Sequence, residues 1–386
     1  MSLFLATFFL TYGGIHLYFY LKARRVFGFG AATAVPLALF LLLMVLAPIL
    51  VRVAEREGLE QAARLLAWTG YCWMGFLFLF FSCSLVFDLW RLTLRLAGLA
   101  FHRELTALRL PPAGAFGIAA AFGLLAVGYS AFEARTIRTE RITVRTPKLP
   151  PGVPKLTVVQ VSDIHLGLIV RQERVGRMLE AVRMAEPDLL VSTGDFVDGQ
   201  VNDIGPLVEM FAAVRPRYGK YAITGNHEYY VGLGQALHFT RRAGFRVLRG
   251  EGETVAGIIN VAGVDDPAGK PFGDFHGADE RALLSSLLPD RFTLFLKHRP
   301  RVDPAALGLF DLQLSGHVHG GQLFPFGLLV RFSYPFMDGF HRLAKGSSLY
   351  VSRGTGTWGP PLRFLAPPEV TVIEIVRSDN STSHSK

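Results

Sequence analysis

Five short clusters of polar residues between positions 162 and 322 contain the residue types that bind metal ions. They occupy residues 162–165, 194–199, 225–228, 297–300 and 316–322. The candidate site residues among them are Asp163, Asp195, Asp198, Asn226, His165, His227, His298, His317 and His319. Oxygen and imidazole ligands without thiolates suit manganese, iron, zinc or magnesium. The set exceeds the needs of one ion, and two ions about 3.5–4 Å apart would serve in-line displacement at phosphorus.

The polar clusters follow apolar runs, which predicts that they lie at the ends of β-strands. We expect strands at residues 156–161, 189–192, 221–224, 259–264, 293–296, 312–315, 349–352 and 370–376. We expect helices at residues 172–185, 205–214 and 235–243. Strands that alternate with helices indicate a layered α/β domain. Ligands bind outside the carboxyl ends of strands in such sheets, so the five loops can converge on one site.

The residues before position 132 are much more apolar than the rest and contain four runs long enough to cross a bilayer, which takes about 20 residues. The runs are at residues 3–21, 31–51, 65–89 and 113–131. The first run lacks the basic start of a signal peptide. The expected organisation is a transmembrane anchor with four helices (1–132), a junction with the first strand (133–155), an α/β domain (136–377) and a disordered tail (378–386).

The formal net charge of +9 owes much to basic residues beside the apolar runs, such as Lys22, Arg24 and Arg25. Basic residues in such positions anchor a protein to lipid headgroups more often than they read DNA. No nucleic-acid-binding motif is present, so we expect a multi-pass cell-membrane protein that binds no nucleic acid. Positive charge in the loops at 22–30 and 90–112 favours an extracytoplasmic α/β domain, although the basic segment at 135–148 opposes this orientation.

The ordered clusters resemble the calcineurin-like metallophosphoesterases. The blocks D-x-H, G-D-x-x-D-G, G-N-H-[DE], a lone His after a strand, and G-H-x-H occur here in that family's order. Gly-Gly-Gln after His319 and the closing run from Arg353 to Glu369 are similar to a membrane-associated bacterial phosphodiesterase branch. Val318 stands where that branch often has Thr, at a position that is not a metal ligand. The resemblance covers residues 136–377 and implies a four-layer αββα sandwich, here preceded by an all-α multi-pass membrane region.

The resemblance also implies a role for each cluster residue. The first ion would be bound by Asp163, His165 and His319, and the second ion by Asn226, His298 and His317. Asp195 would bridge the two ions. His227 would be the general acid, oriented by Asp198. A hydroxide bridging the two divalent ions would attack phosphorus, because an ion lowers the pKa of bound water to about 7. Manganese is the favoured ion among Mn, Fe, Zn and Mg.

The function that we expect is hydrolysis of a phosphoester or pyrophosphate bond. The membrane anchor favours a phosphodiester or a nucleotide-diphospho-lipid as the phosphorylated substrate. The alternative is a non-catalytic membrane-anchored module that binds or senses metal or phosphate, which the complete ligand set with His227 disfavours. A transporter is disfavoured because only His16 is an ionisable residue well inside an apolar run. The sequence indicates no oligomeric state.

Three polar residues near the clusters allow two interpretations each. Asp198 could instead cap a turn. Glu228 could support the ligands or be solvated. Arg299 could bind a substrate phosphate through its planar fork or belong to an ordinary surface.

Two further segments are ambiguous. Asp265 and Asp266 are expected to form a turn before Pro267, in preference to a third metal site. The stretch at 323–340 is rich in Phe, Leu and Pro and is expected to be buried core. Its alternative is an apolar lip for a lipid-like substrate, in which Phe332 and Phe336 would take part.

Overall fold

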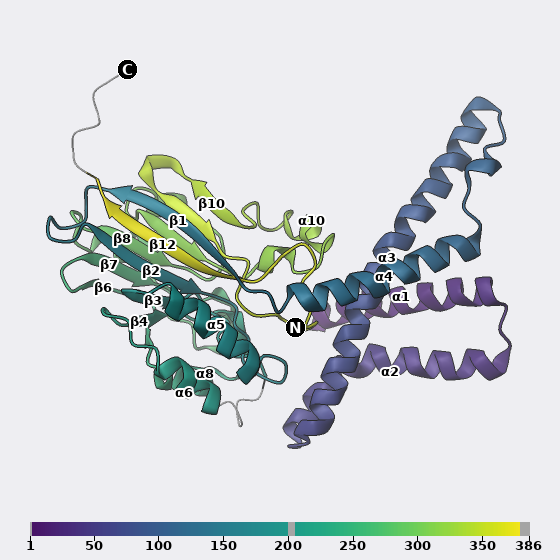
Figure 1. The fold of residues 1–386 in the computed structure, drawn as a ribbon, viewed down its shortest axis with the longest axis horizontal. Coiled ribbons are helices and arrows are strands. Elements are labelled where there is room, and N and C mark those ends of the chain that lie inside the picture. The colour runs from purple at the N-terminus through teal and green to yellow at the C-terminus, as the bar shows by residue number, and fades with distance from the viewer. Residues whose placement is uncertain (1, 200–204, 379–386) are drawn as a thin grey trace. The chain divides into compact units, whose positions relative to one another are not determined.

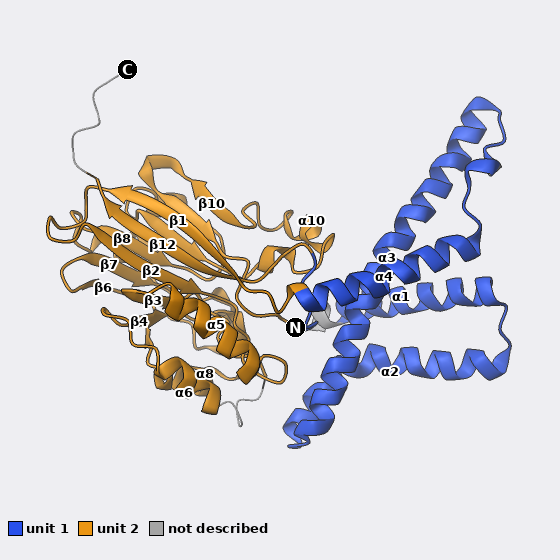
Figure 2. Ribbon diagram, viewed as in Figure 1, with its two compact units in different colours: residues 1–132, 359–364 blue, residues 133–358, 365–386 orange. Residues whose placement is uncertain are grey.

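The computed structural model describes residues 2–199 and 205–378 and divides into two compact units (Figures 1 and 2). Residues 1–132 and 359–364 form the helical unit, and residues 133–358 and 365–386 form the α/β unit. The tail expected at 378–386 lies outside the described residues, apart from Ser378.

Each of the expected membrane runs falls within a long helix of the described chain. These helices are α1 (Ser2–Phe27), α2 (Ala31–Arg56), α3 (Glu60–Phe101) and α4 (Pro112–Glu133). Within the described residues, α2, α3 and α4 are long and apolar enough to cross a membrane, and α1 is not among the helices that meet this criterion. The 42 residues of α3 span about 63 Å, so the run expected at 65–89 is only the apolar middle of a longer helix.

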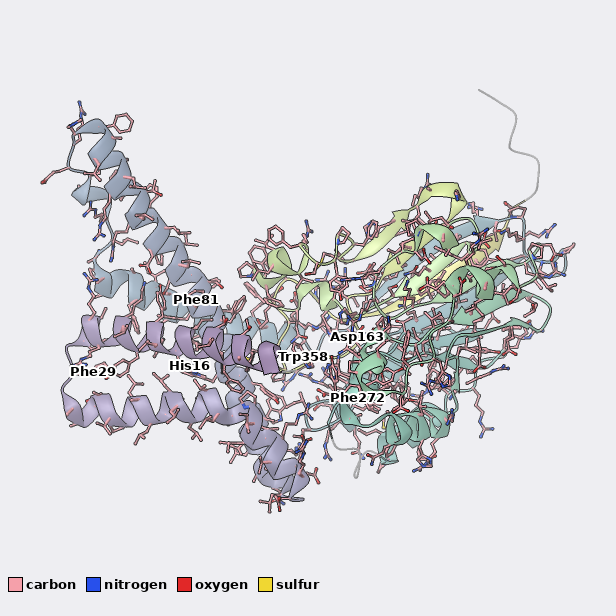
Figure 3. The ribbon with its side chains drawn as sticks, turned by 180° about the vertical axis from the view of Figure 1, so that it is seen from behind. His16, Phe29, Phe81, Asp163, Phe272 and Trp358 are labelled. Carbon is pink, nitrogen blue, oxygen red and sulfur yellow. The ribbon has the colours of Figure 1, made fainter. Side chains whose placement is uncertain are left out.

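Small residues and aromatic rings pack the helical unit. A Cβ atom on Gly70 of α3 would lie 2.6 Å from the Cβ of Ala47 on α2, so these helices approach as closely as glycine permits. His16 (Figure 3) uses both ring nitrogens: Nδ1–H donates to the Tyr12 carbonyl at 2.8 Å, and Trp73 Nε1 donates to Nε2 at 3.0 Å. This histidine is satisfied by its neighbours, which fits an anchor better than a transport path.

Two six-stranded sheets make up the described part of the α/β unit. The order of the first sheet is β1 (Arg138–Thr146), β12 (Glu369–Arg377), β2 (Lys155–Val161), β3 (Leu189–Ser192), β4 (Lys220–Ala222) and β5 (Arg246–Val247). The order of the second sheet is β10 (Gly339–Arg342), β11 (Ser348–Val351), β9 (Leu312–Ser315), β8 (Phe292–Leu296), β7 (Ile259–Gly263) and β6 (Glu251–Val255).

Parallel pairing brings the carboxyl ends of the ligand-bearing strands to common edges. Strands β2, β3, β4 and β5 pair in parallel in the first sheet. Strands β7, β8, β9 and β11 do so in the second, whose edge strands β6 and β10 are antiparallel. The five polar clusters follow β2, β3, β4, β8 and β9, so the sheet topology gathers them as expected.

Three apolar layers hold the sheets and helices together. The helices are α5 (Gln172–Met184), α6 (Gly205–Ala212), α7 (Asn226–Val231), α8 (Leu233–Arg242), α9 (Glu280–Ser285) and α10 (Phe326–Val330). Side chains from α5, α6 and α8 pack on one face of the first sheet, and side chains of both sheets share a buried cluster that includes Val158 and Leu294. On the outer face of the second sheet, Phe295 of β8 packs in one cluster with Leu284 of α9. These layers form the expected αββα sandwich.

The helix α5 shows why local sequence predicts these elements. Val175, Met178, Leu179 and Val182 recur at helical spacing and are all buried, while the opposite face is polar. The expected strand and helix bounds differ from the observed ones by a few residues. The expectations omitted β5, β6 and β10. These strands are short or lie at sheet edges, and because few of their residues are buried, their sequences show little apolar pattern.

Candidate metal centre

The clusters hold their side chains through unusual backbone conformations. Asp163, His165, Asp195, His317 and His319 all have left-handed φ angles, between 50° and 74°. Residues with a Cβ rarely adopt this region, and such strain concentrates where a site requires it. Neighbouring glycines allow the loops to meet: a Cβ on Gly225 would lie 2.2 Å from Asp195 Oδ1. The backbone is therefore shaped around these side chains.

One group of potential ligands consists of Asp163, His165 and His319, all buried. His165 Nε2 lies 3.1 Å from His319 Nε2, which in turn lies 3.4 Å from Asp163 Oδ1. Asp163 accepts hydrogen bonds from Ser162 Oγ at 2.5 Å and from the His317 backbone N–H at 3.0 Å. These bonds orient the carboxylate, as partners of metal ligands commonly do.

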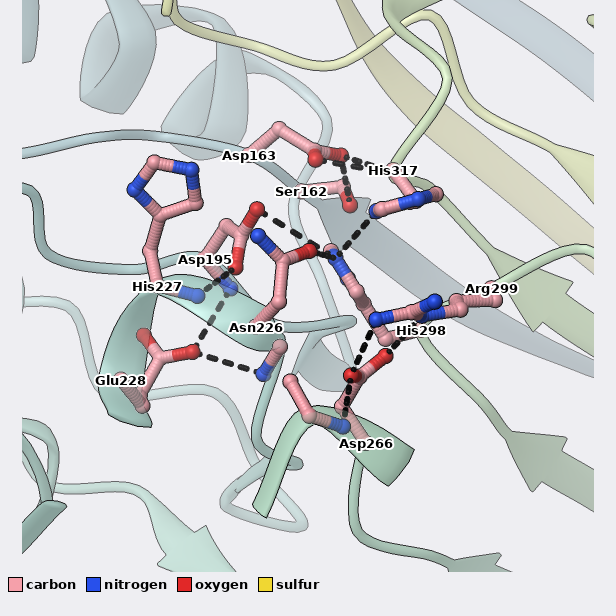
Figure 4. Close-up of polar contacts among 12 residues, drawn as sticks. Ser162, Asp163, Asp195, Asn226, His227, Glu228, Asp266, His298, Arg299 and His317 are labelled. Carbon is pink, nitrogen blue, oxygen red and sulfur yellow. Dashed lines mark hydrogen bonds and ion pairs between the residues drawn. The ribbon is translucent and has the colours of Figure 1, made fainter. Parts of the chain in front are cut away.

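A second group surrounds His298 Nε2 (Figure 4). This nitrogen lies 3.2 Å from Asn226 Oδ1, 3.2 Å from His317 Nδ1 and 3.3 Å from Asp195 Oδ2. Nδ1–H of His298 donates to the Thr193 carbonyl at 2.7 Å. That bond fixes the tautomer and leaves the Nε2 lone pair directed at the other donors, as a metal ligand requires.

Asp195 connects the two groups through a single oxygen. Its Oδ2 lies 3.3 Å from His298 Nε2 and 3.8 Å from His165 Nε2. Its other oxygen, Oδ1, accepts a hydrogen bond from the His227 backbone N–H at 2.8 Å. Buried lone pairs that converge in this way repel one another unless cations lie between them. The donor set and its geometry therefore fit two divalent cations with Asp195 between them.

Burial and mutual charge perturb the pKa values of these groups. Burial raises the pKa of Asp163 to about 6. Burial, together with the nearby His227, lowers the pKa of His165 to about 4 and so favours its neutral form. Burial also acts to raise the pKa of Asp195, but His298 and His227 outweigh it and hold that pKa well below its usual range. Burial acts to lower the pKa of His298, but Asp195 outweighs it and raises that pKa to about 10, so a cation that binds at His298 Nε2 must displace a proton.

His227 lies beside the ligands and pairs with Asp198. Its Nδ1 lies 3.1 Å from Asp198 Oδ1, and its ring packs edge-on against that of His165 at 4.6 Å between centroids. Burial lowers the pKa of His227, but Asp195 and Asp198 outweigh this and raise it to about 9. His227 can therefore carry a proton at neutral pH, with Nδ1–H directed at Asp198 and the second proton on Nε2.

Glu228 is buried and supports two ligand loops. Its carboxylate accepts backbone hydrogen bonds from Asp195 at 3.0 Å, Phe196 at 2.7 Å and Gly225 at 2.6 Å. The side chain thus connects the loop after β3 to the start of α7. Of its two interpretations, support of the ligands is correct and solvation is not.

Arg299 and Asp266 form a bidentate ion pair beside the group of potential ligands around His298 (Figure 4). Arg299 Nε donates to Asp266 Oδ2 at 2.7 Å, and Nη2 donates to Oδ1 at 2.8 Å. Asp266 also accepts from the Ala268 backbone N–H, so it caps a turn as expected. Asp265 pairs with Arg249 at 2.7 Å. Neither aspartate belongs to a group of potential metal ligands among the described residues.

Two contacts near the site were not expected. Tyr334 lies with its hydroxyl 2.9 Å from His317 Nε2. Gln322, the last residue of the Gly-Gly-Gln motif, donates to the Trp358 carbonyl at 2.7 Å and accepts from its backbone N–H at 3.1 Å. The Trp358 ring lies 5.9 Å from that of His227. The Gly-Gly-Gln motif was a usable signal for the second contact, whereas no motif marks Tyr334.

Comparisons with known proteins agree with this geometry. Residues 156–321 match the family model of the calcineurin-like phosphoesterases. An uncharacterized metallophosphoesterase of Aquifex aeolicus is 42% identical over 253 residues, which cover 65% of this chain and 97% of that protein. A transmembrane protein with metallophosphoesterase domain from Danio rerio is 33% identical over 249 residues, which cover 60% of this chain and 56% of that protein. The match thus spans less than two thirds of the zebrafish protein's length.

Among solved structures, that of TT1561 from Thermus thermophilus aligns with a TM-score of 0.34 and 13% identity, over 52% of this chain and 89% of that chain. This similarity is too low to indicate a family or a function. The apolar helices and the transmembrane relative indicate that the protein is membrane-associated. The sequence match to the Aquifex protein, together with the ordered metal-ligating groups, establishes that this chain belongs to the calcineurin-like metallophosphoesterases.

Proposed function

We propose that this protein hydrolyses a phosphodiester or a pyrophosphate bond with the help of two divalent cations. The observation that carries the proposal is the shared position of Asp195 between two groups of buried or half-buried ligands, with His227 beside them. A paired centre of this kind is the arrangement that in-line displacement at phosphorus requires. Membership of the family supports a phosphoester hydrolase as the general class.

The residues divide between the two cations as follows. Asp163, His165 and His319 would hold one cation; Asn226, His298 and His317 would hold the other; Asp195 would contact both. Oxygen and imidazole donors without thiolate suit Mn, Fe, Zn or Mg, and manganese is the ion that we propose among these four. When bound, the cations would lower the pKa of the attacking water and neutralise charge on the phosphoryl oxygens.

The protein's own residues would complete the reaction. His227 would donate the proton on Nε2 to the leaving oxygen, while Asp198 holds Nδ1 and stabilises the protonated ring. Arg299 is the third residue in this proposal. Asp266 orients its guanidinium, which would then bind a phosphoryl oxygen of the substrate.

The substrate and the location also belong to the proposal. A membrane-associated hydrolase meets phosphates that membrane lipids carry, which supports a phosphodiester or a nucleotide-diphospho-lipid. The charge of the loops between the helices supports a multi-pass protein with the α/β unit on the extracytoplasmic side.

The test is hydrolysis of bis(p-nitrophenyl) phosphate by the full chain in detergent, with manganese restored after chelation. The variants Asp195→Asn and His227→Ala should each lose most of the activity, by about 10²-fold or more for the general acid. His238→Ala is the matched control, because His238 is exposed on α8 and should leave activity unchanged.

Metal-dependent activity that both site variants lose would support the proposal. Folded, metal-loaded protein with no activity towards this ester or a pyrophosphate ester would contradict it. That outcome would favour the alternative of a non-catalytic module that binds or senses metal or phosphate.

A further inference from the structure

The α/β unit displays an apolar surface next to the metal centre. The side chains of Phe332, Leu329, Leu328 and Phe324 are 89%, 61%, 53% and 47% exposed. No residue of α10, which is described in full, is buried. The expectation that residues 323–340 form buried core is therefore wrong for residues 324–332. We call Phe324, Leu328, Leu329 and Phe332 the apolar lip.

Residues adjacent to the apolar lip are packed into the protein. The buried cluster that contains Val318 and Met337 is contacted by Val330, Tyr334 and Phe336. Phe336, which the sequence suggested as a lip residue, is therefore one of these packed residues. A Cβ on Gly321 would lie 2.3 Å from the Gly327 Cα, so α10 packs directly on the loop that follows His319. The exposed side chains are consequently held outward by a packed element.

The charged residue within the apolar lip segment is basic. Arg331, between Leu329 and Phe332, is exposed, and residues 323–337 contain no carboxylate residue. Exposed apolar side chains bordered by basic ones are characteristic of segments that lie in the interface of an anionic bilayer. The charge pattern therefore complements a lipid surface.

A bilayer is also the surface to which this unit is tethered. Helix α4, which is apolar and long enough to cross a membrane, ends at Glu133, and β1 begins at Arg138. A link this short keeps the α/β unit at a high local concentration beside lipid. Even a weak affinity for the bilayer interface is then enough to keep the apolar lip in contact with lipid.

We propose that the apolar lip enters the headgroup region of the bilayer and places the metal centre beside phosphates carried by membrane lipids. Tyr334, two residues after Phe332, contacts His317, so the segment that carries the apolar lip also contacts a residue of the proposed metal centre. The membrane contact stands on the exposed surface and its charge. The substrate class, a lipid-borne phosphodiester, rests in addition on the proposed function.

Membrane contact is tested with the full chain in vesicles of phosphatidylethanolamine and phosphatidylglycerol. Cys72 and Cys83 are first replaced by alanine, and Phe332→Cys is labelled with an environment-sensitive fluorophore. Met184→Cys, 77% exposed at the end of α5 in the same unit, is the control. Lipids brominated in the upper acyl chain should quench the label at position 332 severalfold more than the label at 184. Equal quenching at both positions would overturn the proposal and indicate that water or protein covers the lip.

Substrate choice is tested with two esters that share a leaving group. The double variant Leu329→Ser with Phe332→Ser is compared with the unchanged chain in the same vesicles. The activity of the double variant on the p-nitrophenyl ester of dioleoyl phosphatidic acid should be about tenfold lower. Activity on bis(p-nitrophenyl) phosphate should change by less than about twofold, because neither residue belongs to a group of potential metal ligands. Equal losses on both esters would contradict a role in lipid access.

The two proposals can fail separately. If the unchanged chain hydrolyses neither ester, the proposed function is wrong, whereas the quenching experiment still decides whether the apolar lip contacts lipid.

Discussion

The hydroxyl of Tyr334 lies 2.9 Å from Nε2 of His317, while Nδ1 of the same ring lies 3.2 Å from Nε2 of His298. We assign the proton to Nε2, which donates to the Tyr334 hydroxyl and leaves the Nδ1 lone pair for a cation. A partner of this kind fixes the orientation and tautomer of a ligating histidine. We therefore infer that Tyr334 positions His317.

Replacing Tyr334 with Phe should weaken manganese binding by about tenfold or more, because the tautomer of His317 is no longer fixed. Calorimetric titration of the chelated protein with manganese measures this directly. Tyr218→Phe, which alters a half-buried tyrosine elsewhere in the unit, is the control. Unchanged manganese affinity in Tyr334→Phe would remove the positioning role.

Asp198→Asn should move the alkaline limb of the pH–rate profile to lower pH. Asp198 helps to raise the pKa of His227, so loss of its charge lowers the pKa at which the proposed general acid loses its proton. The rate at neutral pH should also fall, by about tenfold or more. Rates measured from neutral to alkaline pH test both effects. An alkaline limb that stays in place would show that Asp198 acts on the turn and not on His227.

Glu228→Gln should destabilise the α/β unit and loosen Asp195. The carboxylate accepts four backbone N–H groups, two on each oxygen, so the amide that replaces it turns a donor towards two of them. The expected loss is about 1–3 kcal/mol in the free energy of unfolding. Thermal unfolding in detergent reports the change. Glu209→Gln, which removes only an exposed ion pair with Arg242, should have little effect.

Arg299→Lys should raise KM for an anionic ester by about tenfold with a smaller change in kcat, because lysine cannot reproduce the planar fork. Asp266 holds two of the guanidinium nitrogens, so the substitution also leaves this buried carboxylate with poorer partners. Arg249→Lys disturbs the similar pair with Asp265 and serves as the control for stability. Equal KM values in Arg299→Lys and the unchanged chain would assign Arg299 to the structural pair alone.

The order of residue types along the chain was sufficient to predict a layered α/β domain and to nominate the loops that carry the polar clusters, whereas the αββα sandwich was implied by the family resemblance. Strand-end residues such as Asp163, Asp195 and His317 could be recognised because parallel strands direct their carboxyl ends to one edge. Long apolar runs predicted the helices of the anchor region because their length must match a bilayer. Both inferences depend on local patterns, which one stretch of sequence contains in full.

Other features depend on which residues meet across the fold. Glu228 has the same local sequence whether it is solvated or accepts bonds from two loops, and only the buried approach of those loops decides between the two. Tyr334 is assigned its partner by the packing of its segment against Val318. The exposure of Phe332 is decided in the same way. An apolar run is equally compatible with core and with surface until tertiary packing determines which of its side chains other residues cover.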